Sequence, residues 1–186
     1  QKGIYEKALD IIAAIAGSLP IGSGMNPGNM INPLVSAKHQ AHVKACISKA
    51  IEQGAKPILN GAAPNEGYYV APQIFTETTQ DMAIMQQEVF GPVISVTPFD
   101  DADEAMTMAN DTIYGLGASI WTSDVNKVMR YVPKFKAGTV WVNAHNIPDQ
   151  NMPFGGFKQS GVGREHGAGA LENYLETKSV CVAYPA

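Results

Sequence analysis

The sequence predicts an α/β fold in which a mostly parallel sheet is flanked by helices. Strand-like and helix-like segments alternate from residue 93 onwards, which is typical of parallel strands joined by right-handed crossovers. Residues 138–143 are an apolar run without alternating polarity, as expected of a strand buried on both faces. The chain has 186 residues, which is enough for one domain with a sizeable core.

The first part of the chain predicts two helices and two strands. Apolar residues recur at helical spacing over residues 4–18, and the glycine and proline residues that follow end this helix. After a loop rich in Gly, Pro and Asn, Ser36 is suited to cap a second helix, which Gly54 ends. Residues 56–59 and 69–75 have the composition of strands.

The alternating part of the chain predicts four strands and three helices. Asp100 and Asp101 favour the start of the first of these helices, and Ser123 or Asp124 caps the second. In chain order we expect a strand over 93–99, a helix to about 109, a strand over 118–122, a helix to about 132, the strand over 138–143, a helix over 167–174 and a strand over 177–183.

The last predicted strand follows the compact part of the chain and has no neighbouring strand in the sequence. We expect it to pair with the sheet edge of another subunit, so that the protein is a homodimer or homotetramer.

Composition and charge exclude several kinds of partner. The formal net charge is −4, with 45% hydrophobic and 16% charged residues, so we expect neither nucleic acid nor an anionic membrane as a partner. No apolar run approaches the ~18 residues of a membrane span, and no signal peptide is visible. The two cysteines make no disulfide framework, which favours a cytoplasmic protein.

The cysteines and histidines suggest no catalytic or metal site by themselves. Cys46 and Cys181 are expected to behave as small buried hydrophobes, because neither adjoins a glycine turn or helix N-terminus that would lower a thiol pKa. His39 and His42 have the i, i+3 spacing of a metal-binding pair, but no further ligand completes the set. We therefore expect these two on a solvated helix face and no metal.

The motif Glu88-Val89-Phe90-Gly91-Pro92 pairs a carboxylate with an aromatic ring at i, i+2. In an extended segment these two side chains point to the same side. Such a pair is able to bind ribose hydroxyls and stack on a flat ring. The alternative is a strand-entry turn with one exposed glutamate.

Asn143 ends the strand over 138–143, and the carboxyl ends of parallel strands are where ligands usually bind. The nine-residue loop 144–152 that follows is a candidate wall of a substrate site. The alternative is an ordinary surface loop.

The next segment, residues 153–165, has four glycines in nine residues, at 155, 156, 161 and 163. A loop this costly in chain entropy is expected to wrap a ligand, a catalytic residue or a neighbouring chain. A glycine turn before a helix is able to bind phosphate, but no phosphate-loop motif is present. We favour a backbone device that positions Phe154.

Together these motifs resemble the NAD(P)-dependent aldehyde dehydrogenase superfamily over essentially the whole chain. The resemblance rests on Glu88-Val89-Phe90-Gly91-Pro92, on Asn110 through Tyr114-Gly115-Leu116, on Gly138-Thr139-Val140-Trp141-Val142-Asn143, on the loop from Pro153 to Glu165, and on Glu176-Thr177-Lys178. It implies a Rossmann-like catalytic domain, NAD or NADP as the coenzyme, and oxidation of an aldehyde to a carboxylic acid through a cysteine thiohemiacetal and thioester.

The resemblance also implies roles for individual residues. Glu88 would bind the nicotinamide ribose hydroxyls, and Phe90 would fix the nicotinamide end. Asn143, Ile147, Pro148 and Phe154 would line the aldehyde tunnel, and Glu165 would lie behind the general base. Arg164, Glu176 and Lys178 would tie the terminal arm to active-site loops across a dimer.

On the same resemblance, residues 1–170 are the C-terminal part of a catalytic domain and residues 171–186 are an oligomerisation arm. The nucleophilic cysteine and the general base are then expected upstream, and the chain alone is expected to be inactive. The alternative is a truncated, catalytically silent assembly module. The polar loop after Asn143 resembles the branch that acts on arylacetaldehydes.

Overall fold

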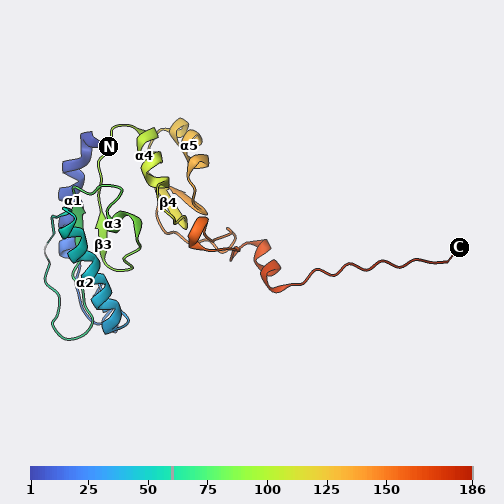
Figure 1. Cartoon of the computed structure of the whole chain (residues 1–186), viewed down its shortest axis with the longest axis horizontal. Coiled ribbons are helices and arrows are strands. Elements are labelled where there is room, and N and C mark those ends of the chain that lie inside the picture. Colours follow the sequence, from blue (N-terminus) through green and yellow to red (C-terminus); the bar gives the residue numbers. More distant parts are fainter. Residues whose placement is uncertain (60, 186) are drawn as a thin grey trace. The chain divides into compact units, whose positions relative to one another are not determined.

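The structure is a computed structural model that describes residues 1–59 and 61–185. The chain divides into two compact units, Gln1–Met108 and the residues from Ala109 onwards. Figure 1 labels helices α1 to α5 and strands β3 and β4. This division differs from the predicted boundary at residue 170, which separates a terminal arm and stays a prediction.

The first unit combines helices with a three-stranded sheet. Its elements are η1 (Lys2–Ile4), α1 (Tyr5–Ser18), α2 (Ala37–Glu52), β1 (Lys56–Pro57), β2 (Gln73–Thr76), α3 (Ala83–Gln86), β3 (Val93–Ser95) and α4 (Ala102–Asn110), whose last turn crosses the boundary. The strand order is β1-β2-β3. Strand β1 is antiparallel to β2, with Lys56 opposite Thr76, and β3 is parallel to β2, with Gln73 opposite Val93.

Helix α2 begins where the sequence predicts. The Ser36 side chain accepts a hydrogen bond from the His39 N–H, and Gly54 follows the helix with φ of +100°. The three strands predicted in this unit are present but are shorter than expected. Each strand ends where the hydrogen bonds to its neighbouring strand end. Helix α3 was not predicted.

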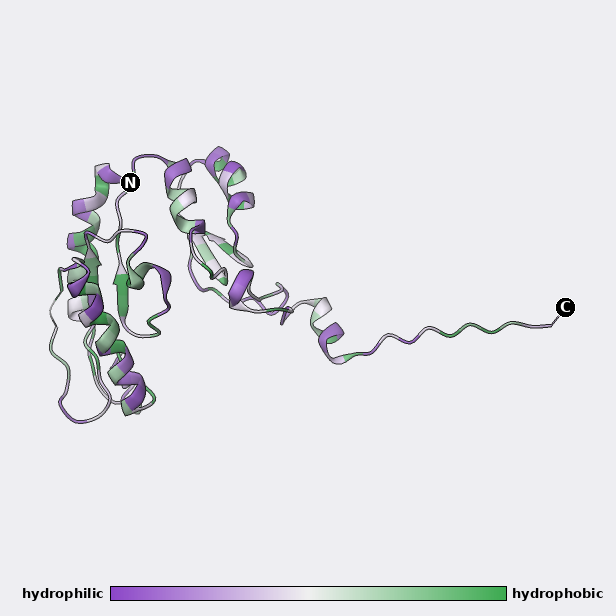
Figure 2. Ribbon diagram, in the orientation of Figure 1, coloured by the Kyte–Doolittle hydropathy of each residue, from purple (hydrophilic) through white to green (hydrophobic). Residues whose placement is uncertain are grey.

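The core of this unit lies between α2 and the sheet. Phe75, Ile74 and Val43 are its largest fully buried side chains, and Val43 clusters with Val70 and Val89. Figure 2 shows strand β3 among the strongly hydrophobic parts of this unit. Truncating Phe75 to Ala would cost ~3–5 kcal/mol. The contact between Val43 and Val89 attaches the Glu88–Pro92 segment to helix α2.

The second unit contains a parallel βαβ arrangement. Its elements are β4 (Gly117–Ile120), α5 (Val125–Tyr131), η2 (Val132–Lys134), β5 (Thr139–Val142), η3 (Lys158–Ser160) and η4 (Ala168–Tyr174). Strands β4 and β5 pair in parallel from Gly117 opposite Thr139 to Ile120 opposite Val142. The two parallel pairs, β2–β3 and β4–β5, confirm the predicted fold class. Asp124, not Ser123, is the N-cap of α5 and accepts from the Asn126 N–H.

Two expectations for this unit were wrong in detail. Strand β5 is not buried on both faces, since only Thr139 is buried and Val142 is exposed; in the described residues β5 has one neighbouring strand. The predicted helix over 167–174 is a 3-10 helix, in keeping with the poor α-helix propensity of its glycines.

Residues 177–183 form no strand, because no ladder partner lies beside them in the described chain. Val180, Val182 and Tyr184 are exposed, and Cys181 is exposed rather than buried. Figure 2 shows hydrophobic residues along this arm. Pairing with a second subunit stays a prediction, and residue 186 at the end of the arm lies outside the described residues.

Across the described residues, no helix combines the length and the apolar character needed to cross a membrane.

Candidate functional site

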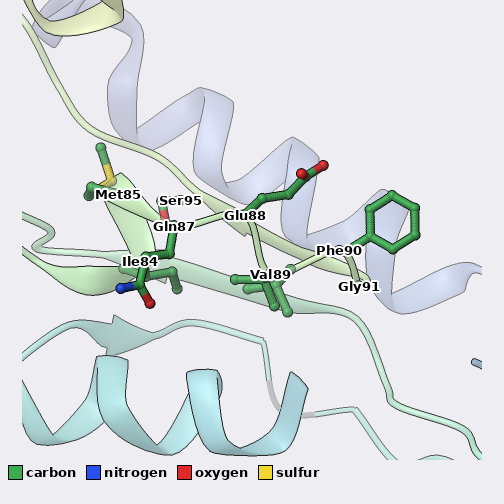
Figure 3. Close-up of a pocket in the computed structure, with 9 residues that line it drawn as sticks. Ile84, Met85, Gln87, Glu88, Val89, Phe90, Gly91 and Ser95 are labelled. Atoms are coloured by element: carbon green, nitrogen blue, oxygen red, sulfur yellow. The ribbon is translucent and has the colours of Figure 1, made fainter. Parts of the chain in front are cut away.

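The Glu88–Gly91 turn presents two side chains of complementary chemistry to one side. Val89 is buried in the core cluster, whereas Glu88 is exposed and Phe90 is 75% exposed. Figure 3 shows the Glu88 carboxylate and the Phe90 ring projecting from one side of the backbone and Val89 from the other. Among residues 1–59 and 61–185, no hydrogen-bond or ion-pair partner occupies the Glu88 carboxylate, so its oxygens are available to a ligand's hydroxyl groups.

An open cavity of about 590 Å³ adjoins this turn. It is lined by segments before, within and after the motif, namely Ile84, Met85, Gln87, Glu88, Val89, Phe90, Gly91, Val93 and Ser95 (Figure 3). The mixture of apolar walls with a free carboxylate suits a ligand that has both a flat ring and hydroxyl groups.

The turn is not the extended segment that the spacing suggests, because Phe90 has φ of +52°. A bulky residue is uncommon in this left-handed region, which costs ~1–2 kcal/mol. Gly91 is required next to it, since a Cβ there would lie 2.9 Å from both Val43 methyl carbons. The turn is therefore pressed closely against α2.

Helix α2 contributes His39 to this turn, a contact that the sequence did not predict. Its Nε2 lies 2.8 Å from the Phe90 carbonyl oxygen, and the two rings stack with centroids 5.8 Å apart. The expectation that His39 and His42 share a solvated face was therefore wrong for His39, which is half-buried against Phe90. His42 is exposed and lies 3.6 Å from the Cys46 Sγ.

A second cavity, of about 220 Å³, lies in the second unit. It brings together three residues predicted for the aldehyde tunnel, Ile147, Pro148 and Phe154. The remaining lining residues are Thr139, Trp141, Asn146, Asp149, Met152, Pro153 and His166. Most of this wall is apolar or aromatic, so the cavity suits the hydrocarbon body of a small ligand.

Trp141 and His145 hold the loop that carries this wall. The Trp141 indole N–H donates to the Ile147 carbonyl at 3.0 Å, and the His145 ring contacts the Trp141 ring edge-on. His145 Nδ1 also lies 2.8 Å from the Ser119 hydroxyl. The sequence predicted none of these three contacts, because each joins the loop to a strand.

Asn143 does not line this cavity. Its side-chain Oδ1 accepts from the Thr122 N–H at 2.8 Å, and its Nδ2 donates to the Thr122 carbonyl at 2.9 Å. Asn143 also has φ of +52°, a conformation that Asn tolerates. The side chain thus extends the β4–β5 ladder by one pair, and its predicted contact with substrate stays a prediction.

The glycine loop wraps its own chain. A Cβ on Gly138, which immediately precedes β5, would lie 1.7 Å from the Gly155 carbonyl oxygen, and one on Gly155 would lie 2.5 Å from the Gly163 oxygen. The glycines therefore allow backbone to lie on backbone.

Two charged residues of the loop also bind backbone carbonyl groups close by. Arg164 donates to the Gly156 and Gly163 carbonyls and lies over the Phe157 ring. Lys158 donates to the Asn110 and Thr112 carbonyls, both at 2.8 Å.

The structure does not bring together the three residues predicted for the subunit interface. Glu176 and Lys178 lie exposed in the arm, whereas Arg164 contacts its own loop. Glu165 contributes its backbone to a bridge with Phe154, and its side chain is exposed. In the part of the chain that the structure describes, no three His, Cys, Asp or Glu side chains gather as a metal site would require.

Residues 1–180 match the sequence model of the aldehyde dehydrogenase family. The chain belongs to this family. It is 48% identical over 187 residues to the phenylacetaldehyde dehydrogenase of Pseudomonas fluorescens, covering 99% of this chain and 37% of that protein. It is 42% identical over 186 residues to a betaine aldehyde dehydrogenase of Rhizobium etli, covering 98% of this chain and 38% of the relative.

Solved aldehyde dehydrogenase structures agree with the fold. The NAD+ complex of the Bacillus cereus aldehyde dehydrogenase superposes with a TM-score of 0.92 at 41% identity, covering 97% of this chain and 37% of that one. The Mycobacterium tuberculosis aldehyde dehydrogenase complexed with NAD+ gives a TM-score of 0.91 at 34% identity, covering 99% and 39%. This chain thus spans somewhat more than a third of the aldehyde dehydrogenases that it matches.

Proposed function

We propose that the whole protein oxidises an aldehyde to the carboxylic acid with NAD or NADP, and that this chain supplies coenzyme-facing and aldehyde-facing side chains. The observation that carries the proposal is the pairing of a free Glu88 carboxylate with the exposed Phe90 ring on one side of an anchored turn. Family membership and relatives solved with NAD+ support it.

Glu88 and Phe90 fit the nicotinamide half of the coenzyme. The carboxylate would accept hydrogen bonds from the ribose hydroxyls, and the ring would limit the position of the nicotinamide. When bound, the coenzyme would supply the acceptor for a hydride from the substrate carbon. Because that transfer requires a near-attack distance, a turn that is pressed against α2 is a suitable support.

The second cavity would hold the body of the aldehyde. Its apolar and aromatic wall, with Trp141, Ile147 and Phe154, favours an uncharged hydrocarbon or aromatic body. The 48% identity to a phenylacetaldehyde dehydrogenase supports an arylacetaldehyde as the substrate class.

The isolated 186-residue chain is proposed to be inactive. Cys46 is half-buried within helix α2 and Cys181 lies in the extended arm, so neither occupies a glycine turn or helix N-terminus of the kind that activates a thiol. We propose that another part of the whole protein supplies the nucleophile. Two free cysteines also fit a reducing cytoplasm, which we propose as the location.

An assembly module without catalysis is the second candidate. The exposed apolar residues of the arm favour it, because Val180, Val182 and Tyr184 present alternate side chains without cover. This arm also supports a homodimer or homotetramer for the active enzyme. The enzyme and the assembly module therefore differ only in whether the protein oxidises an aldehyde.

The test is an assay of the full-length protein with phenylacetaldehyde and betaine aldehyde, following reduction of NAD+ and NADP+. We expect Glu88→Gln to raise the KM for coenzyme by about 10- to 100-fold, as for loss of a charged hydrogen-bond partner. Glu52→Gln, at an exposed glutamate of α2, is the matched control and should change nothing. Full-length protein that reduces neither coenzyme would instead favour the assembly module.

Phe154→Ala tests the aldehyde cavity separately. We expect its KM for phenylacetaldehyde to rise by about tenfold while its KM for acetaldehyde changes little, because the small aldehyde leaves the wall uncontacted. An equal rise for both aldehydes would contradict the proposed place of the aromatic body.

A further inference from the structure

We propose that His39 is a positioning residue for the nicotinamide end of the coenzyme, acting through Phe90. The inference rests on the proposed function of the Glu88–Phe90 turn, and it adds a residue on a different element, helix α2. His39 itself is not required to touch coenzyme or substrate.

Phe90 needs such support because its backbone is in a conformation that phenylalanine rarely adopts. Its φ of +52° belongs to the left-handed region, which bulky residues leave when nothing holds them. The residue is 75% exposed, so core packing does not hold its side chain. The restraint must come from neighbouring groups, and His39 supplies two contacts.

The first contact is a hydrogen bond with a defined direction. The Phe90 carbonyl oxygen only accepts, so His39 Nε2, 2.8 Å away, carries the hydrogen and donates it. The second contact is the stack of the two rings, with an interplanar angle of 26°. One imidazole thus restrains both the main chain and the side chain of Phe90.

His39 is itself well placed to act as a support. Its backbone N–H donates to the Ser36 side chain that caps α2, which fixes the first turn of the helix. One turn further along, Val43 packs against Gly91. Helix α2 therefore contacts two successive residues of the turn, at Phe90 and at Gly91.

The other ring nitrogen of His39, Nδ1, makes the predicted tautomer of the ring measurable. His39 Nδ1 is buried and has no hydrogen-bond partner among the described residues. A neutral His39 should therefore be the Nε2–H tautomer, with its orientation set by the Phe90 contact. Nitrogen NMR of the histidine rings in the 186-residue chain reads this tautomer directly.

The NMR test uses His39→Gln, His39→Leu and His42→Leu. The glutamine retains a side-chain N–H that is able to donate to Phe90, whereas leucine keeps bulk without a donor. We expect the Phe90 amide resonance to move in His39→Leu, to move less in His39→Gln and to stay in His42→Leu. An Nδ1–H tautomer of His39, or a Phe90 amide resonance that does not move in His39→Leu, would overturn the positioning role of His39.

The kinetic test uses the same variants in the full-length protein. We expect His39→Leu to raise the KM for coenzyme about three- to tenfold, as for one lost hydrogen bond, while the KM for aldehyde stays unchanged. His39→Gln should recover much of the loss, and His42→Leu should match the parent.

The outcomes separate the inference from the function beneath it. If the parent protein reduces coenzyme normally and His39→Leu leaves the coenzyme KM unchanged, or raises both KM values equally, only the role of His39 is overturned. If the parent protein reduces neither coenzyme, the proposed function fails, and the coenzyme role of His39 fails with it.

Discussion

Phe154 and Glu165 exchange two backbone hydrogen bonds, each 2.8 Å long, and so close the glycine-rich loop between them. This bridge joins the wall of the apolar cavity to the end of the loop. The segment it encloses lies against the residue that precedes β5, where Gly138 meets Gly155. The loop is therefore a scaffold that holds Phe154 on the sheet.

Gly138→Ala should destabilise the second unit by ~2–4 kcal/mol, because its methyl group would collide with the Gly155 carbonyl oxygen. Gly169→Ala is the matched control, since a Cβ there meets nothing within 4 Å. Its effect should stay within ~0.5 kcal/mol. Urea unfolding of the 186-residue chain measures both, and equal midpoints would show that the backbone contact is unimportant.

Lys158→Met should loosen the segment that follows α4. The lysine ammonium donates to the Asn110 and Thr112 carbonyls from an exposed position, so we expect a loss of ~1 kcal/mol. Amide hydrogen exchange should quicken around Gly115. Lys127→Met, at an exposed lysine of α5, is the control. The same exchange pattern in both variants would count against a stabilising role for the two Lys158 hydrogen bonds.

Asn143→Asp should destabilise the β4–β5 pair by ~1–3 kcal/mol, because a carboxylate has no N–H to donate to the Thr122 carbonyl and repels it. Asn143→Gly separates the side chain from the backbone, since glycine also accepts the positive φ. We expect thermal unfolding to show a loss for both. A glycine variant as stable as the parent would mean that the amide contributes nothing.

Tyr5 should make stability depend on pH in the alkaline range. Its hydroxyl donates to the Val96 carbonyl, and burial raises the pKa of this phenol above its ordinary value near 10. The neutral form is therefore favoured by folding. Its contribution is complete below pH ~10 and is lost as pH rises through the folded-state pKa.

Tyr5→Phe should cost ~0.5–1.5 kcal/mol at neutral pH and flatten this alkaline decline. Tyr68→Phe, at an exposed tyrosine of the same unit, should change neither the stability at neutral pH nor its alkaline decline. Urea midpoints measured from pH 7 to 11 test the point, and an unchanged decline in Tyr5→Phe would contradict it.

The terminal arm should pair with a second subunit, and Cys181 reports on this pairing. The thiol is exposed in the single chain, between Val180 and Val182. We expect it to react with a thiol reagent more slowly as protein concentration rises, while light scattering shows at least a dimer. A monomer at micromolar concentration, with Cys181 reacting at a constant rate, would refute pairing through the arm.

Several features could be predicted because their causes are local. Ser36, Asp101 and Asp124 cap helices through atoms two or three residues away, so the sequence places these helix starts well. Strand lengths were overestimated, since a ladder ends where its partner ends. Ile147, Pro148 and Phe154, which the resemblance groups, line one cavity, while their contact with a substrate stays a prediction. The contacts of Trp141 and His145 that hold the cavity's loop were not predicted.

The sequence by itself determined the family, the α/β class and the motif that carries Glu88 and Phe90, because these depend on residue types at short fixed spacings. Only the tertiary structure decided what holds these groups. His39 lies 51 residues before Phe90 and contacts its carbonyl and ring. Gly138 and Gly155 meet because two distant backbones pack without side chains between them. Contacts of this kind arise from packing, which local spacing does not encode.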